Sequence, residues 1–156
     1  MKYIKPKREH EDNLKAQLYK WTNRSGLHLH FEYRHENSRF DAVFVREGEI
    51  LAIIEIKNWT PSQALKAKRK PTKQLRKYLS FGPPVLVVWS WKGTRGLVST
   101  LKKIADSFDN SRRLPKTRLS FYPKPKKPAQ KDELTLLIEE QAKDMKFGHL
   151  AKTRRA

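Results

Sequence analysis

The stretch RFDAVFVREGEILAIIEIKN, residues 39–58, is typical of two buried strands joined by a tight turn. Both arms are apolar on both faces, which favours central strands that are covered on two sides. The glycine in the turn REGE, residues 46–49, can supply the positive φ that a tight or bulged loop needs. Three charged residues interrupt the apolar arms: Asp41 in the first, and Glu55 and Lys57 in the second. Because buried charges are costly unless they are paired or bound to a metal, these residues mark a candidate site.

Whether the two acids meet depends on how the turn sets the register of the hairpin. Side chains alternate along a strand, so Glu55 and Lys57 point to the same face. A three-residue loop or a β-bulge would place Asp41 directly opposite Glu55, whereas a plain two-residue loop would put the two acids on opposite faces. We expect the three-residue loop or a bulge.

Facing carboxylates carry a chemical implication of their own. They repel, and each raises the pKa of the other unless a divalent cation lies between them. Oxygen ligands without a nearby histidine or cysteine favour Mg²⁺ or Mn²⁺. A lysine beside such a metal can orient an attacking water and offset charge that develops on a phosphate. The three charged residues therefore predict metal-assisted hydrolysis of a phosphodiester.

The flanking sequence predicts the elements around this hairpin. Residues 9–24 repeat apolar side chains at helical spacing, and residues 25–35 alternate as a half-exposed strand does. The segment 60–82 is polar and basic, and Pro71 is expected to break or restart a helix there. The apolar run PPVLVVWSW that follows is typical of a buried strand, and residues 96–110 place apolar residues on one helical face. The predicted order is a helix, three antiparallel strands, a helix, a strand and a helix. This order predicts an α/β fold with a mixed central sheet flanked by helices.

The hairpin residues also resemble a known signature. Asp41, followed by EIK at residues 55–57 at the end of the next apolar strand, resembles the motif of the PD-(D/E)XK nuclease superfamily. The order of predicted elements is similar to the αβββαβ core of that restriction-endonuclease-like fold. The resemblance covers roughly residues 9–91, and Phe40 stands where the nominal signature has proline.

The resemblance implies roles for the residues of the motif. Asp41 and Glu55 would be metal ligands together with the Ile56 carbonyl, and Lys57 would position the nucleophilic water. The cofactor would be Mg²⁺ or Mn²⁺, with no small-molecule cofactor.

Two further features are similar to that superfamily. Residues 73–78, KQLRKY, carry Gln74 and Tyr78 one helical turn apart, like the Gln-x-x-x-Tyr element whose side chains face the active site and DNA in several branches. The first helix of the fold often carries an acidic metal ligand, and Glu11 lies nearest the core-facing stripe of residues 9–24. We therefore expect Glu11 and Gln74 to contribute to catalysis, with Glu11 also a metal ligand.

Each of these predictions has a structural alternative. The acid and the lysine of EIK could form a structural ion pair. The aspartate could be a strand-end acid, the Gln and Tyr pair could serve packing alone, and the helical glutamate could simply favour the helix N-terminus through the dipole.

The charge of the chain points to a polyanionic partner. Lysine and arginine total 35 against 16 aspartate and glutamate residues, a formal net charge of +19. DNA is the leading partner, ahead of a ribosome-associated role and of an anionic membrane surface. The residues expected to bind nucleic acid are Lys66, Lys68, Arg69, Lys70, Lys73, Arg76, Lys77, Tyr78, Arg112, Arg113, Lys124, Lys126 and Lys127.

Composition also suggests how the chain is organised. Residues 1–110 are expected to form the nuclease core, 111–130 a basic, proline-rich linker or arm with one short strand at RLSFY, residues 118–122, and 131–156 a C-terminal helix with a basic tail. There is no cysteine, and no apolar run approaches membrane-spanning length. We expect a cytoplasmic, nucleoid-associated protein of a bacterial or phage-infected cell.

Together these features predict a small metal-dependent DNA endonuclease. It would be structure-specific, in the manner of a Holliday-junction resolvase, or a nicking enzyme of a phage or mobile element. The alternatives are a non-catalytic nucleic-acid-binding protein that keeps the nuclease fold, and a basic accessory protein with an accidental motif. The sequence leaves open whether the protein acts as a monomer or a homodimer.

Overall fold

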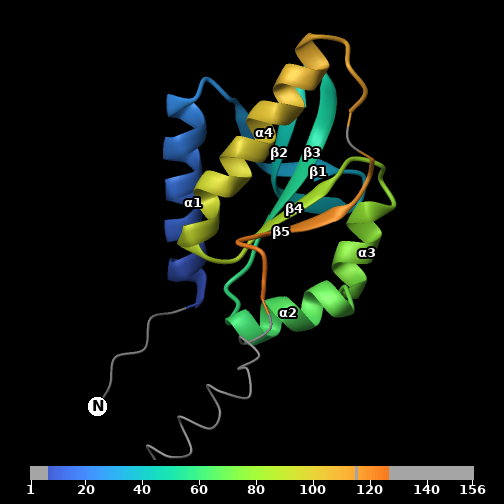
Figure 1. Ribbon diagram of the computed structural model, residues 1–156. Helices are drawn as coiled ribbons and strands as arrows, with labels where there is room; N and C mark the ends of the chain where they lie inside the picture. The colour runs from blue at the N-terminus through green and yellow to red at the C-terminus, as the bar shows by residue number, and fades with distance from the viewer. Residues whose placement is uncertain (1–6, 115, 127–156) are drawn as a thin grey trace, which may run out of the picture. The chain divides into compact units, whose positions relative to one another are not determined.

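The computed structural model describes residues 7–114 and 116–126, which form ten elements (Figure 1). In chain order they are α1 (Lys7–Arg24), β1 (Leu29–His35), β2 (Ser38–Arg46), β3 (Glu49–Ile56), α2 (Pro61–Arg69), α3 (Lys73–Leu79), β4 (Val85–Val88), the 3₁₀ turn η1 (Trp91–Gly93), α4 (Thr94–Asp109) and β5 (Leu119–Tyr122). The chain divides into two compact units, residues 1–125 and 126–156, and all ten elements belong to the first.

The strands form one five-stranded mixed sheet in the order β1-β2-β3-β4-β5. Strands β1, β2 and β3 pair antiparallel, whereas β4 runs parallel to β3 and β5 runs parallel to β4. The α/β class, the mixed sheet and the order of elements through α4 agree with the prediction from the sequence.

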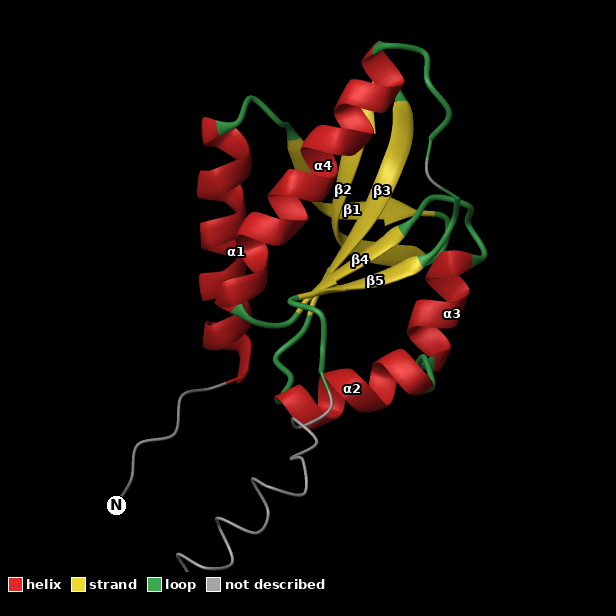
Figure 2. Ribbon diagram, in the orientation of Figure 1, coloured by secondary structure: helices red, strands yellow, loops and turns green. Residues whose placement is uncertain are grey.

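Helices cover both faces of the sheet, and each pair of helices closes its own apolar core (Figure 2). Helices α1 and α4 pack on one face, where Leu18 and Leu101 meet Ile54. Helices α2 and α3 pack on the other, where Leu75 meets Ile53. Because the central strands are covered on two sides, they are apolar on both faces, as the sequence indicated.

The hairpin between β2 and β3 combines a two-residue turn with a β-bulge. Glu47 and Gly48 both have positive φ, 50° and 79°, as a type I′ turn requires. Next to the turn the pairing is that of a plain two-residue loop, but it shifts between Phe44 and Val45. Beyond the shift the strands follow the register that places Asp41 opposite Glu55. The expected register is therefore confirmed, and the bulge rather than a three-residue loop provides it.

The bulge lies at Leu51 and Ala52 on β3. These consecutive residues both pack in the α1/α4 core, whereas strict alternation would send them to opposite faces. The neighbouring Ile50 and Ile53 pack against the α2/α3 core. One extra residue thus moves the rest of β3 by a single step and turns Glu55 toward α3.

Pro71 separates α2 from α3, as expected. A helix cannot continue through a proline, which lacks the backbone N–H and clashes with the preceding turn. Each of the two helices begins at a threonine cap: Thr60 Oγ1 accepts from the N–H of Gln63, and Thr72 Oγ1 accepts from the N–H of Leu75, both at 3.2 Å.

The segment expected to be a linker or arm contains the predicted short strand, and this strand forms the last strand of the sheet. Strand β5 lies within residues 111–130, and it extends the sheet beyond the core boundary placed at residue 110. Its backbone bonds both ends of β4, from the Arg118 carbonyl to the Val85 N–H at 2.9 Å and from the Tyr122 carbonyl to the Trp89 N–H at 3.1 Å. The physical reason is that β4 would otherwise expose an unpaired edge. The expected C-terminal helix and tail lie outside the described residues.

No helix within the described ranges is both long and apolar enough to cross a membrane.

Candidate active site

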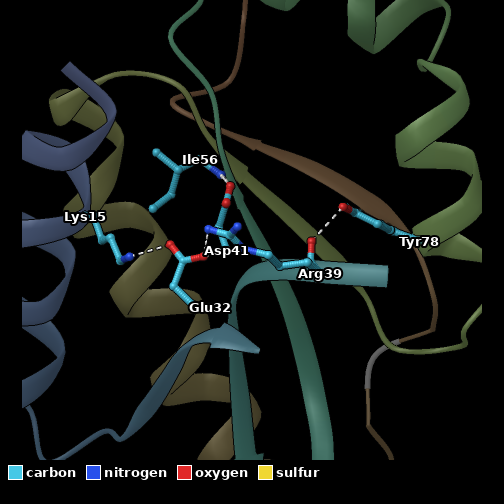
Figure 3. A network of polar contacts seen from close by, with 6 residues as sticks. All are labelled: Lys15, Glu32, Arg39, Asp41, Ile56 and Tyr78. Carbon is cyan, nitrogen blue, oxygen red and sulfur yellow. Dashed lines mark hydrogen bonds and ion pairs between the residues drawn. The ribbon is translucent and has the colours of Figure 1, made fainter. Parts of the chain in front are cut away.

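The three charged residues of the hairpin meet at the end of β3, on the α2/α3 face of the sheet. Lys57 Nζ lies 3.6 Å from Glu55 Oε1. Asp41 Oδ2 accepts a 2.7 Å hydrogen bond from the backbone N–H of Ile56, which holds the carboxylate of β2 across the end of β3 (Figure 3). The predicted juxtaposition of Asp41, Glu55 and Lys57 is present.

Glu55 is the most unusual group in this cluster. It is only 4% exposed, and its Oε2 atom has no hydrogen-bond partner. Burial first, and then the neighbouring Asp41, raise the pKa of Glu55, and the Lys57 ammonium lowers it by less, so that the pKa lies at about 9. At neutral pH this carboxyl holds a proton, and a positive charge beside Oε2 would be needed to ionise it.

A chain of hydrogen bonds joins Lys57 to α3. Lys57 Nζ donates to Gln74 Oε1 at 2.8 Å, and Gln74 Nε2 donates to the Tyr78 hydroxyl at 3.0 Å. The Tyr78 hydroxyl in turn donates to the Arg39 carbonyl at 3.1 Å (Figure 3). Gln74 and Tyr78, one turn apart on α3, therefore lie at the site and hold Lys57 in place.

Tyr78 keeps its proton throughout the physiological range. It is 3% exposed, and burial together with the nearby Glu55 raises its pKa to about 12. A protonated hydroxyl can both accept from Gln74 and donate to the β2 backbone. Tyr78 thus acts as a hydrogen-bonded link between α3 and the strand that carries Asp41.

Asp41 lies at the point where side chains on one side of the β1–β2 strand pair pass from the α1/α4 core to the α2/α3 core. Glu32, opposite it on β1, has a positive φ of 54°. On one side of this point Phe31 packs in the α1/α4 core, and on the other side Tyr33 packs in the α2/α3 core. Asp41 therefore lies directly beside the point where the two strands change face, and its carboxylate accepts the hydrogen bond from the N–H of Ile56.

An ion-pair network supports this twist, and the sequence reasoning missed it. Glu32 accepts a 2.6 Å hydrogen bond from Lys15 Nζ of α1, and it also pairs with the guanidinium of Arg39 (Figure 3). These two cations lower the pKa of Glu32, the hydrogen bond from Lys15 having the largest effect. The only signal in the sequence was that Arg39 stands two residues before Asp41 on the same strand.

Glu11 is not brought into the cluster. It lies half-buried on α1, and within the described ranges no three His, Asp or Glu side chains form a group that could hold a metal. Among the side chains that the structure describes, the acidic pair Asp41 and Glu55 therefore has no third carboxylate beside it.

Most of the predicted nucleic-acid-binding residues are exposed around the site. The side chains of α2, α3 and the loop between them include seven exposed cations, and no acid lies in either helix. These are Lys66, Lys68, Arg69, Lys70, Lys73, Arg76 and Lys77. A cavity of about 570 Å³ beside the cluster is lined by Asn37, Ser38, Arg39, Lys73, Gln74, Lys77 and Tyr78.

The remaining predicted basic residues are farther along the chain. Arg112 is exposed and pairs with Asp106 at 3.6 Å, and Arg113 is exposed nearby. Lys124 is exposed and lines a second, smaller cavity beside β5. Lys126 is exposed and belongs to the second unit, and Lys127 lies outside the described residues.

The arrangement combines two adjacent carboxyl groups, one of them with an unsatisfied buried oxygen, and a lysine held by an amide. Such a cluster can bind a divalent cation, stabilise negative charge on a phosphate and orient an attacking water. The basic surface of α2 and α3 adjoins it through Lys73 and Lys77 and can hold a polyanion.

Comparison of the chain with protein-family models, with curated proteins and with solved structures finds no match.

Proposed function

We propose that the protein is a metal-dependent endonuclease of the PD-(D/E)XK superfamily, which hydrolyses phosphodiester bonds in DNA. One observation carries the proposal: Asp41, Glu55 and Lys57 lie together at the end of β3, and Glu55 Oε2 is buried without a partner. A buried carboxyl oxygen without a hydrogen-bond partner is costly unless a ligand binds to it. The αβββαβ order of the first seven elements, with α2 and α3 standing for one broken helix, also supports membership of that superfamily.

The oxygen donors fit Mg²⁺ or Mn²⁺. Asp41 and Glu55 would hold the cation with the Ile56 carbonyl, and water would fill its remaining positions, since Mg²⁺ keeps several waters. When bound, the cation supplies Lewis-acid stabilisation of the phosphate and makes a water more acidic. Glu55 must give up its proton to become a ligand, so binding of the cation is coupled to release of that proton.

Lys57 is the residue that acts on the substrate. Its side chain is about a quarter exposed, 23%, and Gln74 accepts a hydrogen bond from its ammonium and so fixes its direction. From this position it can orient a water and offset negative charge on the phosphate as the bond to phosphorus forms. Gln74 and Tyr78 would act as positioning residues that keep the ammonium pointed at the substrate.

The basic surface of α2 and α3 would hold the nucleic-acid backbone beside this cluster. Lys73 and Lys77 line the 570 Å³ cavity next to the site, where they can meet phosphates on either side of the bond to be cut. The described part of the chain has no separate recognition domain. This favours a structure-specific or nicking enzyme over a sequence-specific one.

A non-catalytic nucleic-acid-binding protein is the alternative, and one observation favours it. The Ile56 N–H already satisfies one oxygen of Asp41, and Lys57 lies near Glu55, so the cluster is partly neutralised without a cation. In that case the cluster would serve stability alone, and Lys57 would contact no substrate.

The test is cleavage of a panel of substrates, namely duplex, single-stranded, nicked and branched DNA and RNA, with Mg²⁺ or Mn²⁺ and with EDTA. The variant Lys57→Ala should lose cleavage and keep DNA binding. Lys103→Ala, an exposed lysine on α4 in the opposite layer, is the matched control and should keep both. Absence of cleavage by the wild type on every substrate, with DNA binding intact, would establish the alternative.

A further inference from the structure

Trp91 is exposed in a way that packing does not explain. It is 59% exposed, one of two large hydrophobic side chains in the described residues that remain so open, the other being Tyr19. Its neighbour in sequence, Trp89, is 8% exposed and donates its Nε1–H to the Pro123 carbonyl at 2.7 Å. Two tryptophans two residues apart thus have different surroundings, and only Trp89 belongs to the core.

The backbone around Trp91 is held rigidly although the ring is not covered. The 3₁₀ turn η1 packs against the end of β5 so closely that a Cβ on Gly93 would lie 2.0 Å from the carbonyl carbon of Tyr122. The buried Thr94 donates its hydroxyl to the Trp91 carbonyl at 2.8 Å. The backbone that carries the indole is therefore fixed, so no backbone ordering is needed when a ligand stacks on the ring.

Basic and aromatic side chains surround this indole. Lys92 Nζ lies 5.9 Å from the Trp91 ring centre, and the Arg95 guanidinium lies 4.7 Å from that of Trp21. A cavity of about 530 Å³ opens here between α1, η1 and α4. Its lining has three cations and no acid: Gln17, Lys20, Trp21, Trp91, Lys92, Thr94 and Arg95. Aromatic rings interleaved with cations are the pattern that binds unpaired nucleotides.

The cavity lies at the same end of the sheet as the candidate active site. Strands β3 and β4 are parallel, with Ile56 paired to Val88, and the N–H of Lys57 donates to the Val88 carbonyl at 3.0 Å. Trp91 follows Val88 by three residues, a span of no more than about 11 Å. The site faces α2 and α3, whereas the cavity faces α1 and α4. A nucleic acid that crosses this end of the sheet can reach both.

We propose that Trp91, with Lys92 and Arg95, binds a single-stranded segment of DNA by stacking an unpaired base on the indole. The cations contact the adjoining phosphates. Paired bases in a regular duplex cannot reach the ring, so this contact selects single-stranded, forked or branched DNA over duplex. The inference rests on the proposed function, because it names the substrate class of that same nuclease.

The experiment measures binding in EDTA, so that cleavage does not enter the result. Fluorescence anisotropy of the full chain with a labelled single-stranded oligonucleotide, a fork and a duplex gives three dissociation constants. Trp91→Ala should weaken single-strand and fork binding by about tenfold or more, the loss of one stacked base, and leave duplex binding within about twofold. Trp91→Phe keeps a ring and should recover most of the affinity. Tyr19→Ala, which removes the other exposed aromatic, is the control and should change neither.

A second variant keeps the result independent of any effect on folding. Lys92→Gln should weaken single-strand binding and reduce the slope of log affinity against log salt by about 0.7, as the loss of one phosphate contact to a single strand does. Equal weakening for duplex and single strand with Trp91→Ala, or no weakening for either, would overturn the inference. Failure of the nuclease proposal is read separately, from the absence of cleavage with Mg²⁺, and it leaves these binding constants unaffected.

Discussion

The substitution Glu55→Gln tests the state of the buried carboxyl directly. The pKa of Glu55 is raised from 4.5 to about 9, so the native protein keeps a proton on this group that the unfolded chain loses above pH 4.5. The native state therefore binds more protons than the unfolded state between these two values, and its stability falls as the pH rises through that window. Glutamine resembles the neutral acid and cannot ionise. The variant should lack this fall.

The size of the effect follows from the shift. Each pH unit inside the window corresponds to about 1.4 kcal/mol, so the burial of Glu55 costs up to about 3 kcal/mol at pH 7. The side chain is only 6% exposed, so solvent screens little of this cost. Since the glutamine amide brings donors that must find partners, we expect the net gain of Glu55→Gln at pH 7 to be about 1–3 kcal/mol.

The assay is urea unfolding in EDTA at pH 5.5, 7 and 8.5, in wild type and variant. The difference between the two proteins isolates Glu55 from the other titrating groups. We expect the advantage of the variant to grow with pH by roughly 1 kcal/mol per unit. If the wild type is the more stable protein at pH 8.5, or if the difference does not change with pH, Glu55 is ionised in the native state. The reasoning from its burial would then be wrong.

Three further changes test the site and its supports. Mg²⁺ at 100 times its dissociation constant should raise the unfolding free energy of the wild type by about 2.7 kcal/mol, and by much less in Glu55→Gln; equal stabilisation in both would place the cation elsewhere. Gln74→Ala should lower kcat by about 10- to 100-fold with little change in KM, because the lysine ammonium loses the group that orients it; an unchanged kcat would remove Gln74 from the positioning role. Gly93→Ala should lower the unfolding free energy by about 1–3 kcal/mol or more in urea titrations, since the added Cβ would overlap the Tyr122 backbone. Gly96→Ala should lower it by less, because there the added Cβ meets only a side-chain atom of Tyr122, at 3.3 Å.

Much of the architecture could be predicted because apolar periodicity is a local property. The stripe through α1 and α4, the continuous apolar arms of β2 and β3, and the break at Pro71 each follow from rules that involve neighbouring residues alone. The pairing of Gln74 with Tyr78 follows equally from helix geometry, which places residues four apart on one face. These features appear in the structure where the sequence placed them.

Features that depend on distant parts of the chain could not be predicted. The positive φ of Glu32 is imposed where β1 and β2 twist from one core to the other, and Lys15 of α1 helps to hold it. The sequence predicts a short strand at residues 118–122, which is present as β5, but its place beside β4 could not be predicted, because pairing with β4 depends on a distant strand and not on the local composition. The hydrogen bond from Tyr78 to the Arg39 carbonyl could not be predicted either, because it joins residues far apart in the sequence.

The bulge at Leu51 shows how the site and the two cores are linked. Near the turn, β3 sends Ile50 to the α2/α3 core, and the extra residue then lets Leu51 and Ala52 both fill the α1/α4 core. Without it, the same strand could bury its apolar residues only with Glu55 turned toward α1 and α4, away from Asp41 and Lys57. The burial of the apolar side chains of β3 therefore offsets the cost of burying one polar group, the Glu55 carboxyl, whose Oε2 atom lacks a hydrogen-bond partner. A strand that only had to be stable would carry an apolar residue at this position, so the cost of Glu55 is itself the strongest argument that the cluster binds something.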